Sequence, residues 1–371
     1  MNHAQDRVLM ERAIEVGRQA RYWSAPNPPV GCVLAHGSEV IGTGFTQPAG
    51  QAHAEVMALN AAGDAKGATA YVTLEPCSHE GATGPCVTAL IAAGISRAVI
   101  AVEDPNPQVA GRGIAALRAA GIEVDLGMGA EQVEQDLAGF LLRMRRGHGR
   151  ITLKLAVSLD GRIAMASGES QWITGEPARR DVQLLRAQSD LIVTGVGTVL
   201  ADDCRLTLRP DELPLEGEAK TRALAHGPAR MVLDSRGRMP ADARILEGAS
   251  TVIVTTEGVK RGDANSPCQL PADPMGRVDL GAWVAYVGEQ AHNDILVEAG
   301  PTLSGALLQG GWVDQLILYQ APKILGDSAR PMANMSIDVL AEAPEFDIID
   351  VTRLGADLRI MATPGSGRSA S

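Results

Sequence analysis

Residues 69–104 read TAYVTLEPCSHEGATGPCVTALIAAGISRAVIAVED, and this stretch indicates the fold of the first part of the chain. The apolar runs at 69–76 and 97–104 predict two strands. Pro85 to Ala93 predict a helix between them, with Gly94 at its end. One Pro-Cys pair therefore follows a strand, and the other opens a helix.

Helices and strands alternate on both sides of this stretch. Leu9, Ala13, Val16 and Ala20 share one face of a first amphipathic helix. Such alternation is typical of an α/β sandwich with mixed strand pairing. The further elements predicted in the first half are a hairpin at 30–46 that turns at 36–38, helices at 53–63 and 113–120, and a strand at 122–127.

The pattern changes near residues 140–150, where a basic, glycine-bearing segment interrupts the periodicity. A chain of 371 residues is long enough for two domains. We expect one domain at 1–146, a second at 150–364 and a disordered tail at 365–371. The second domain is expected to be α/β again, with polar surface insertions at 211–228 and 258–277. Its predicted strands lie within 151–164, 190–197, 229–235, 250–256, 294–300 and 315–325.

Composition and charge exclude several classes of protein. Hydrophobic residues make up 45% of the chain, which is typical of a globular protein and excludes disorder over most of it. Aromatic residues make up 3%, too few for the stacking platforms that bind single-stranded nucleic acid. The net charge is -11, and both halves are acidic. Because long nucleic acids require a basic surplus, no nucleic-acid partner is expected.

Targeting and redox signals point to one compartment. No apolar run reaches the roughly 18 residues of a membrane-spanning helix. The segment up to Ala25 is charged and lacks the apolar core of a signal peptide. Five widely spaced cysteines fit reduced thiols or metal ligands better than a disulfide framework. We therefore expect a cytoplasmic protein with no membrane partner.

A group of potential metal ligands surrounds the two Pro-Cys pairs. His53 begins a predicted helix, Cys77 follows a strand and Cys86 begins the next helix, so one imidazole and two thiols converge near helix N-termini. Three protein ligands leave the fourth position of a zinc ion open for water, the arrangement of catalytic zinc. Glu55 is expected beside that water as the group that moves its proton to a leaving amine. The structural alternative is two buried thiols beside a surface histidine.

His-x-Glu with Pro-Cys-x-x-Cys is the signature of zinc nucleobase deaminases. In this chain eight residues, rather than two, separate Cys77 from Cys86. The insertion predicts a loop at the metal and indicates a particular branch of that superfamily.

In the second half, two charged residues interrupt apolar strands. Lys154 lies in the middle of one strand, and Glu298 ends another apolar run. Such charges need a partner or a ligand, so the two form either a buried structural ion pair or a polar pair that faces a ligand. Gly300-Pro301-Thr302 starts a helix whose free N–H groups form an anion site. No Gly-x-Gly-x-x-Gly fingerprint follows the first strand, which argues against a Rossmann cofactor site.

The motifs of both halves together resemble one enzyme family. The segments PNPPVGCV (26–33), HAE (53–55), LEPCSH (74–79), GPC (84–86) and DPNPQVAGRG (104–113) are similar to the deaminase half of the bifunctional riboflavin-biosynthesis deaminase/reductases. Four later segments are similar to the reductase half of the same family: SLDGRIAMASGESQWIT (158–174), RRDVQLLRAQSD (179–190), TVLADD (198–203) and VEAGPTLSGALLQ (297–309). The resemblance covers nearly the whole chain, in order.

This resemblance implies a fold, two cofactors and a set of site residues. The implied fold is a cytidine-deaminase-like α/β/α sandwich followed by a dihydrofolate-reductase-like α/β domain that binds NADPH. The implied zinc (Zn2+) ligands are His53, Cys77 and Cys86, and the implied proton donor is Glu55. The implied cofactor contacts are Ala156, Trp172, Thr198, Asp202, Ser235, Gly300, Pro301, Thr302, Leu303, Ser304, Gly305 and Ala306, and the implied substrate contacts are Lys154, Ser170, Arg186, Leu206, Arg209 and Glu298.

The implied activity has two steps on one small molecule. Zinc-dependent hydrolytic deamination converts 2,5-diamino-6-(5-phosphoribosylamino)pyrimidin-4(3H)-one to 5-amino-6-(5-phosphoribosylamino)uracil, and NADPH then reduces the ribosyl to the ribityl side chain. Arg186 and Arg209 are expected to bind the substrate phosphate, since a guanidinium pairs with phosphate through two N–H groups. Either Arg236 or Arg238 is expected to contact the 2′-phosphate of NADP. Family members commonly self-associate, which implies a homo-oligomer.

Two other hypotheses stay open on the sequence. One is a tRNA or polynucleotide deaminase with an accessory domain, which the acidic charge, the few aromatic residues and the long Cys–Cys spacing disfavour. The other is a non-catalytic binding protein with one inactive domain. The presence of all four zinc-site residues and of the reductase pattern disfavours it.

The chain departs from the family pattern at three positions. Ala82 and Gly84 replace an arginine and a proline in the loop before the last zinc ligand, and Cys204 replaces a proline in a turn. Cys204 and Cys268 belong to no metal or nucleophile pattern and are predicted to be non-catalytic. Cys32 is predicted to be a small core residue.

Overall fold

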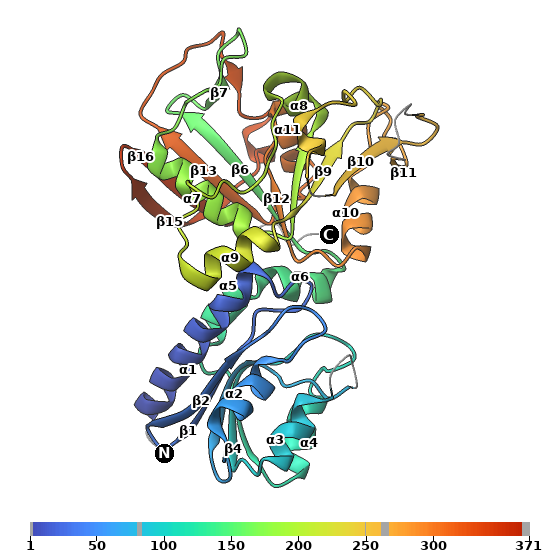
Figure 1. Ribbon diagram of the computed structural model, residues 1–371. Coiled ribbons are helices and arrows are strands. Elements are labelled where there is room, and N and C mark those ends of the chain that lie inside the picture. Colours follow the sequence, from blue (N-terminus) through green and yellow to red (C-terminus); the bar gives the residue numbers. More distant parts are fainter. Residues whose placement is uncertain (1–2, 80–83, 249, 261–266, 366–371) are drawn as a thin grey trace. The chain divides into compact units, whose positions relative to one another are not determined.

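The structure, a computed structural model, describes residues 3–79, 84–248, 250–260 and 267–365. The chain forms two compact units, Met1–Gly149 and Arg150–Ser371, each with its own sheet and hydrophobic core (Figure 1). The α/β fold predicted for both halves is confirmed. No helix in the described ranges is long and apolar enough to cross a membrane. Of the tail expected at 365–371, all but Gly365 lies outside the described residues, as does Ala82.

The first unit is an α/β/α sandwich around a five-stranded sheet. Its elements are α1 (His3–Arg18), η1 (Gln19–Tyr22), β1 (Gly31–His36), β2 (Glu39–Phe45), α2 (Ala54–Ala62), β3 (Thr69–Leu74), α3 (Cys86–Ala92), β4 (Arg97–Val102), α4 (Arg112–Ala119), β5 (Glu123–Leu126), α5 (Ala130–Asp136) and α6 (Ala138–Arg146). The strand order is β2-β1-β3-β4-β5, with β1 antiparallel to both neighbours and β3, β4 and β5 parallel. In Figure 1, α1 and α2 lie on opposite sides of β1 and β2.

Every residue of β4 is buried, as expected for a parallel strand covered on both faces.

A close contact between β2 and α2 fixes the position of the start of α2. At the edge of the sheet, a Cβ at Gly44 would lie 2.3 Å from the carbonyl oxygen of Ala54. Only glycine leaves room for α2 to rest directly on β2. The first turn of α2, which carries Glu55, is therefore held against the sheet.

A buried cation ties α1 to the sheet. Arg97, at the start of β4, is 7% exposed, so its charge needs partners inside the unit. Its guanidinium donates hydrogen bonds of 2.9 and 3.0 Å to Asp6 of α1 and also pairs with Asp125 of β5. Tyr71 of β3 donates its hydroxyl to Asp6 at 2.6 Å. The hydrogen bond from Arg97 lowers the pKa of Asp6, and one carboxylate thus joins a helix to neighbouring strands.

The second unit is an α/β domain around a nine-stranded sheet. Its elements are β6 (Arg150–Ser158), β7 (Arg162–Ala164), α7 (Glu176–Ala187), β8 (Leu191–Gly195), α8 (Val196–Asp202), α9 (Gly217–Ala225), β9 (Ala229–Leu233), η2 (Arg244–Leu246), β10 (Thr251–Thr256), β11 (Cys268–Leu270), α10 (Leu280–Glu289), β12 (Asp294–Val297), α11 (Pro301–Gln309), β13 (Gln315–Ala321), β14 (Arg330–Pro331), η3 (Leu340–Glu342), β15 (Phe346–Leu354) and β16 (Asp357–Pro364). β7 and β14 form a small separate sheet.

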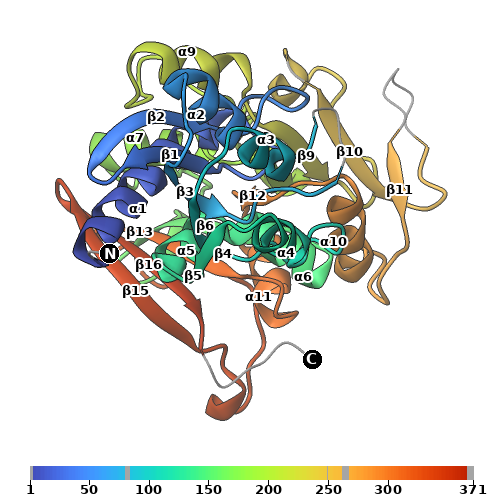
Figure 2. The ribbon, with the colours of Figure 1, turned by 90° about the horizontal axis from the view of Figure 1, so that it is seen from below.

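The large sheet has the order β11-β10-β9-β8-β12-β6-β13-β16-β15. In this order, the strands from β11 at one edge as far as β13 all run parallel. β16 pairs antiparallel with β13, and β15 pairs antiparallel with β16. Figure 2 shows β11 and the β15–β16 pair at opposite edges. Side chains alternate across the sheet, as on β8, where Leu191 and Val193 join the core under α10 and α11 and Ile192 joins the core under α8.

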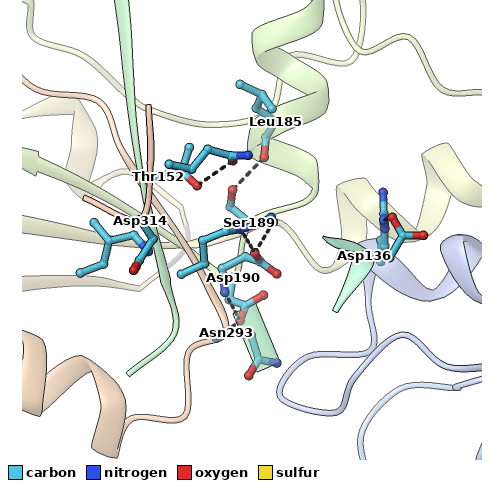
Figure 3. Close-up of polar contacts among 12 residues, drawn as sticks. Asp136, Thr152, Leu185, Ser189, Asp190, Asn293 and Asp314 are labelled. Carbon is cyan, nitrogen blue, oxygen red and sulfur yellow. Dashed lines mark hydrogen bonds and ion pairs between the residues drawn. The ribbon is translucent and has the colours of Figure 1, made fainter. Parts of the chain in front are cut away.

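Polar contacts close the amino edge of this sheet (Figure 3). Asp190, just before β8, accepts hydrogen bonds from the backbone N–H groups of Asn293 and Asp294 at 2.5 and 3.2 Å. Asp314 accepts a hydrogen bond from the N–H of Ile151 at 2.8 Å. These side chains satisfy backbone groups at the start of the central strands.

The structure differs from the sequence-based prediction in three parts of the second unit. The segment 211–228 contains helix α9, and 258–277 contributes the edge strand β11, whose backbone pairs with β10 and whose Cys268 and Leu270 pack against the core. Strands β15 and β16 are absent from the prediction. In β15 the register shifts between Ile348 and Asp350, so Ile349 is an extra residue and two adjacent apolar side chains, Ile348 and Ile349, are exposed. This bulge removes the period-two alternation that identifies a strand.

We expect Asp6→Ala to lower the free energy of unfolding of the first unit by about 3 kcal/mol, because it removes a buried partner of Arg97. The pKa of Asp6 is lower in the folded chain, so this stabilisation is present above the unfolded pKa and is lost as the pH falls through the folded one. Hydrogen exchange of the β4 amides in urea reports on this unit. The matched control is Glu134→Ala, which breaks an exposed 3.1 Å pair with Arg145 and should cost at most about 0.5 kcal/mol. Equal losses would contradict the prediction.

Candidate functional site

His53, Cys77 and Cys86 meet beside the carboxyl end of β3. His53 precedes α2, Cys77 follows β3 and Cys86 is the first residue of α3. Nδ1 of His53 lies 3.6 Å from Sγ of Cys77 and 3.3 Å from Sγ of Cys86, and the three donor atoms lie within 4.8 Å of one another. Tetrahedral zinc, with bonds of about 2.3 Å to sulfur and 2.0 Å to nitrogen, holds such atoms roughly 3.5 Å apart. The donor set and its spacing fit zinc.

Backbone contacts hold the two thiols together. The N–H of Cys86 donates to Sγ of Cys77 at 3.4 Å, and the N–H of Val87 donates to the carbonyl oxygen of Cys77 at 3.2 Å. A hydrogen bond between the thiols lowers the pKa of Cys77 to about 4 and raises the pKa of Cys86. His53 is half-buried with its ring toward both sulfurs, which is not the surface histidine of the structural alternative.

Glu55 lies in the first turn of α2, two residues after His53. It is 3% exposed, and this burial raises the pKa of its carboxyl to about 7. A carboxyl with a pKa near neutrality can both accept and release a proton. Cys32, also in this unit, is fully buried in the core.

The second unit contains a cavity of about 1210 Å³ at the carboxyl edge of its parallel strands. The ends of β8, β9 and β12 and the first turns of α8 and α11 border it. Of the sequence-predicted contacts, the following line the cavity: Lys154, Ala156, Ser170, Trp172, Arg186, Thr198, Asp202, Leu206, Arg209, Ser235, Glu298, Gly300, Pro301, Thr302, Leu303 and Ala306, together with Arg236, Arg238 and Cys204.

Two predicted cofactor contacts do not line the cavity. Ser304 is fully buried, and its hydroxyl donates to the carbonyl oxygen of Ala299 at 3.3 Å. A Cβ at Gly305 would lie 2.1 Å from the carbonyl oxygen of Asn334. Both residues face the protein interior because successive helical positions point in different directions. Ser304 bonds to the backbone before α11, and Gly305 lets the backbone of Asn334 approach the helix.

Glu298 lies between two cations in the cavity wall. Arg186 donates to its carboxylate at 2.6 and 3.1 Å, and Nζ of Lys154 lies 3.3 Å away. Burial raises the pKa of Glu298, but the charges of Arg186 and Lys154 outweigh it and hold the pKa at about 2. The residues therefore form a buried ion cluster and also line the cavity, so both sequence-based interpretations of Lys154 and Glu298 apply.

The arginines expected to bind phosphate differ in their surroundings. Arg186 also donates to the carbonyl oxygen of Thr207 at 3.1 Å, which leaves two of its five N–H groups for a ligand. The guanidinium of Arg209 lies 5.9 Å from the ring of Trp172, and that of Arg179 lies 4.6 Å from the same ring. Arg179 has no sequence-based prediction, yet it lines the cavity beside Trp172.

Hydrogen bonds organise the cofactor side of the cavity. Thr198 accepts a hydrogen bond from the N–H of Gly300 at 3.1 Å, which joins α8 to the start of α11. Ser170 donates to Asp202 at 3.4 Å, and burial raises the pKa of Asp202.

A hydrogen bond between Ser235 and Val278 brings Arg277 to the cavity. Ser235 accepts a hydrogen bond from the N–H of Val278 at 3.0 Å, and the adjacent Arg277 lines the cavity together with Arg236 and Arg238. Arg277 belongs to the segment expected to be a surface insertion. No local sequence signal could have indicated this contact.

Comparisons with known proteins match both units. Residues 150–360 match the RibD C-terminal domain family, and residues 3–102 match the cytidine and deoxycytidylate deaminase zinc-binding region. Riboflavin biosynthesis protein RibD of Escherichia coli (strain K12) is 49% identical over 363 residues, which cover 95% of this chain and 98% of that protein. The structure of Acinetobacter baumannii RibD, form 1, is 43% identical with a TM-score of 0.89, over 98% of this chain and 99% of that one.

A third relative has a more descriptive name. The diaminohydroxyphosphoribosylaminopyrimidine deaminase/5-amino-6-(5-phosphoribosylamino)uracil reductase of Thermotoga maritima is 30% identical, with a TM-score of 0.85 over 98% of this chain and 99% of that one. These similarities extend over both units and do not stop at the deaminase-like half.

Cys77→Ser and Cys86→Ser are each expected to reduce bound zinc from about one ion per chain to near none, because each removes a thiolate ligand. The measurement is zinc content after dialysis against a chelator. Cys204→Ser and Cys268→Ser are matched controls in the second unit and should retain the zinc content of the unmodified chain. Full zinc retention by either ligand variant would contradict the assignment of that residue.

Proposed function

The chain belongs to the RibD family of riboflavin-biosynthesis proteins, and from that premise we propose which of its residues carry out the deaminase and reductase reactions. It is a bifunctional enzyme, with a zinc-dependent deaminase and an NADPH-dependent reductase. A polynucleotide deaminase with an accessory domain is not favoured, because the relatives match over both units. The convergence of His53, Cys77 and Cys86 beside the buried Glu55 is the observation that carries the first half of the proposal.

The first reaction is hydrolytic removal of the 2-amino group of the diaminopyrimidine. His53, Cys77 and Cys86 would hold zinc, which supplies a Lewis acid that acidifies water. The carboxylate of Glu55 accepts a proton from the water that attacks C2 and returns it to the nitrogen that leaves as ammonia. Its burial supports this role, since it shields the carboxyl from competing bulk water.

The second reaction is reduction of the ribosyl group at C1′, for which bound NADPH supplies the hydride. The backbone N–H groups of Thr302 and Leu303, in the first turn of α11, would bind the cofactor's pyrophosphate. Thr198 keeps this turn in place through its bond to Gly300. Lys154 and Glu298 would face the ribose, and Arg209 with the two remaining N–H groups of Arg186 would bind the phosphate.

Arginines at one part of the cavity favour a phosphorylated dinucleotide. Arg236 and Arg238 follow β9, and Arg277 is brought beside them by the bond between Val278 and Ser235. A phosphate with two negative charges would be stabilised there through charge-assisted hydrogen bonds. We therefore assign the 2′-phosphate of NADPH to this cluster.

Self-association, which the family resemblance implies, and a cytoplasmic location, which the five widely spaced cysteines favour, are also part of the proposal. Among the residues that the structure describes, β15 is an edge strand with unpaired backbone groups along one side. Its side chains Ile348, Ile349 and Val351 are 64%, 55% and 54% exposed. Burial of these groups against a second copy supports a homo-oligomer, which sedimentation can test.

Mass spectrometry of the product tests both reactions. With the diamino substrate we expect a gain of about one mass unit without NADPH and about three with it, since deamination exchanges NH for O and reduction adds two hydrogens. Glu55→Gln should leave the diamino substrate unchanged, yet add about two units to the deaminated substrate with NADPH. Deamination by Glu55→Gln would contradict the role of Glu55. No mass change with the unmodified chain would contradict the proposed function.

Arg236→Ala and Arg238→Ala are expected to lower the preference for NADPH over NADH, by about tenfold for whichever residue contacts the 2′-phosphate. The measurement is the ratio of kcat/KM for the two cofactors with the deaminated substrate. Arg222→Ala, which removes an arginine of α9 that does not line the cavity, is the control and should leave the ratio unchanged. An unchanged ratio in both cavity variants would refute the assignment.

A further inference from the structure

Glu75 is a buried carboxylate for which the deaminase chemistry above has no role. It is 3% exposed and lies directly after β3, two residues before Cys77. Its carboxylate accepts three backbone hydrogen bonds, from the N–H of Asp104 at 3.2 Å, of Gly111 at 3.0 Å and of Ile114 at 3.1 Å. Glu75 therefore joins the end of β3 to a segment that follows β4.

The three N–H groups come from the loop between β4 and α4 and from the first turn of α4. Asp104 and Gly111 lie at the two ends of the loop between β4 and α4, and Ile114 lies in the first turn of α4. Burial raises the pKa of the Asp104 side chain to about 6, and the charges of Cys77 and His79 also act on it. The loop is thus close enough to the metal site to share its electrostatic environment.

The contact between α4 and the segment 75–76 is also sterically tight. A Cβ at Gly113 would lie 2.2 Å from the carbonyl oxygen of Pro76 and 3.0 Å from Oε1 of Glu75. Glycine at this position lets the start of α4 approach the residue that precedes Cys77. The position of α4 and the position of Cys77 are therefore coupled through backbone contact as well as through Glu75.

We propose that Glu75 is a positioning residue of the deaminase site, an inference that rests on the proposed function. Its three charge-assisted hydrogen bonds hold the loop 104–111 and the first turn of α4 at a fixed distance from Cys77. Cys77 is then preorganised as a metal ligand, and the loop forms a fixed wall beside the bound pyrimidine. Groups outside the ligand set commonly tune metal affinity in this way.

Glu75→Gln isolates this effect with little change in volume. A glutamine side chain has one acceptor oxygen and one NH2 group, so the NH2 group faces at least one of the three N–H donors. At least one backbone N–H therefore loses its acceptor, while the space that the Glu75 side chain occupies stays filled. Asp6→Asn is the matched control, since it makes the same change at a buried carboxylate of the same unit that bonds to Arg97 and Tyr71 rather than to the site.

The experiment uses the full chain and three readouts. Zinc affinity is measured by competition with a chromogenic chelator, deamination is split into kcat and KM, and hydrogen exchange reports on the Gly111 and Ile114 amides. For Glu75→Gln we expect about tenfold weaker zinc binding, a raised KM for the diamino substrate and faster exchange at both amides. Reduction of the deaminated substrate by the same chain should be unchanged. Asp6→Asn should lower thermal stability and leave zinc affinity and KM as they are.

Each outcome decides the matter. If Glu75→Gln lowers stability as Asp6→Asn does but keeps zinc affinity and KM, Glu75 is structural only and the inference is wrong. If Glu75→Gln does not fold, Gly113→Ala strains the same junction and is measured in its place, with the same expected shifts. If the unmodified chain binds zinc but does not deaminate the substrate, the proposed function fails, while zinc affinity and amide exchange still test Glu75.

Discussion

Parallel strand pairing is the constraint on which both sites depend. Parallel strands place their carboxyl ends, and the helix N-termini that follow, at one edge of a sheet. In the first unit Cys77 follows β3 and Asp104 follows the parallel strand β4, which brings their loops together. In the second unit β8, β9 and β12 end at the cavity. At the opposite edge, Asp190 accepts backbone hydrogen bonds from Asn293 and Asp294.

Three buried glutamate carboxylates have different roles because their surroundings differ. Glu298 lies between Arg186 and Lys154, and their charges hold its pKa at about 2, so it stays ionised and orients two cations in the cavity wall. Glu75 is satisfied by three backbone N–H groups and serves as a fixed junction. At Glu55 burial dominates and raises the pKa to about 7, which suits a group that accepts and releases a proton.

Local patterns predicted much of this molecule because their causes are local. The strand predicted within 151–164 forms as β6, and its Ile151, Leu153 and Val157 lie in the core. His53, Cys77 and Cys86 could be grouped because each begins a helix or follows a strand. The prediction failed at β15, where a bulge breaks the alternation. It also missed Arg277, which reaches the cavity through a turn that sequence patterns describe only as polar.

The sequence by itself determined the fold class and the family and predicted the zinc donor set, because side-chain chemistry, periodicity and motif order are properties of short segments. Tertiary structure decided which charges meet. Arg186 and Glu298 are 112 positions apart, and Lys154 and Glu298 are 144 apart. Only the packing of helices on the sheet brings such groups within hydrogen-bond distance. It likewise turned Ser304 and Gly305 away from the cavity, because one face of a helix must be buried whenever the other lines a site.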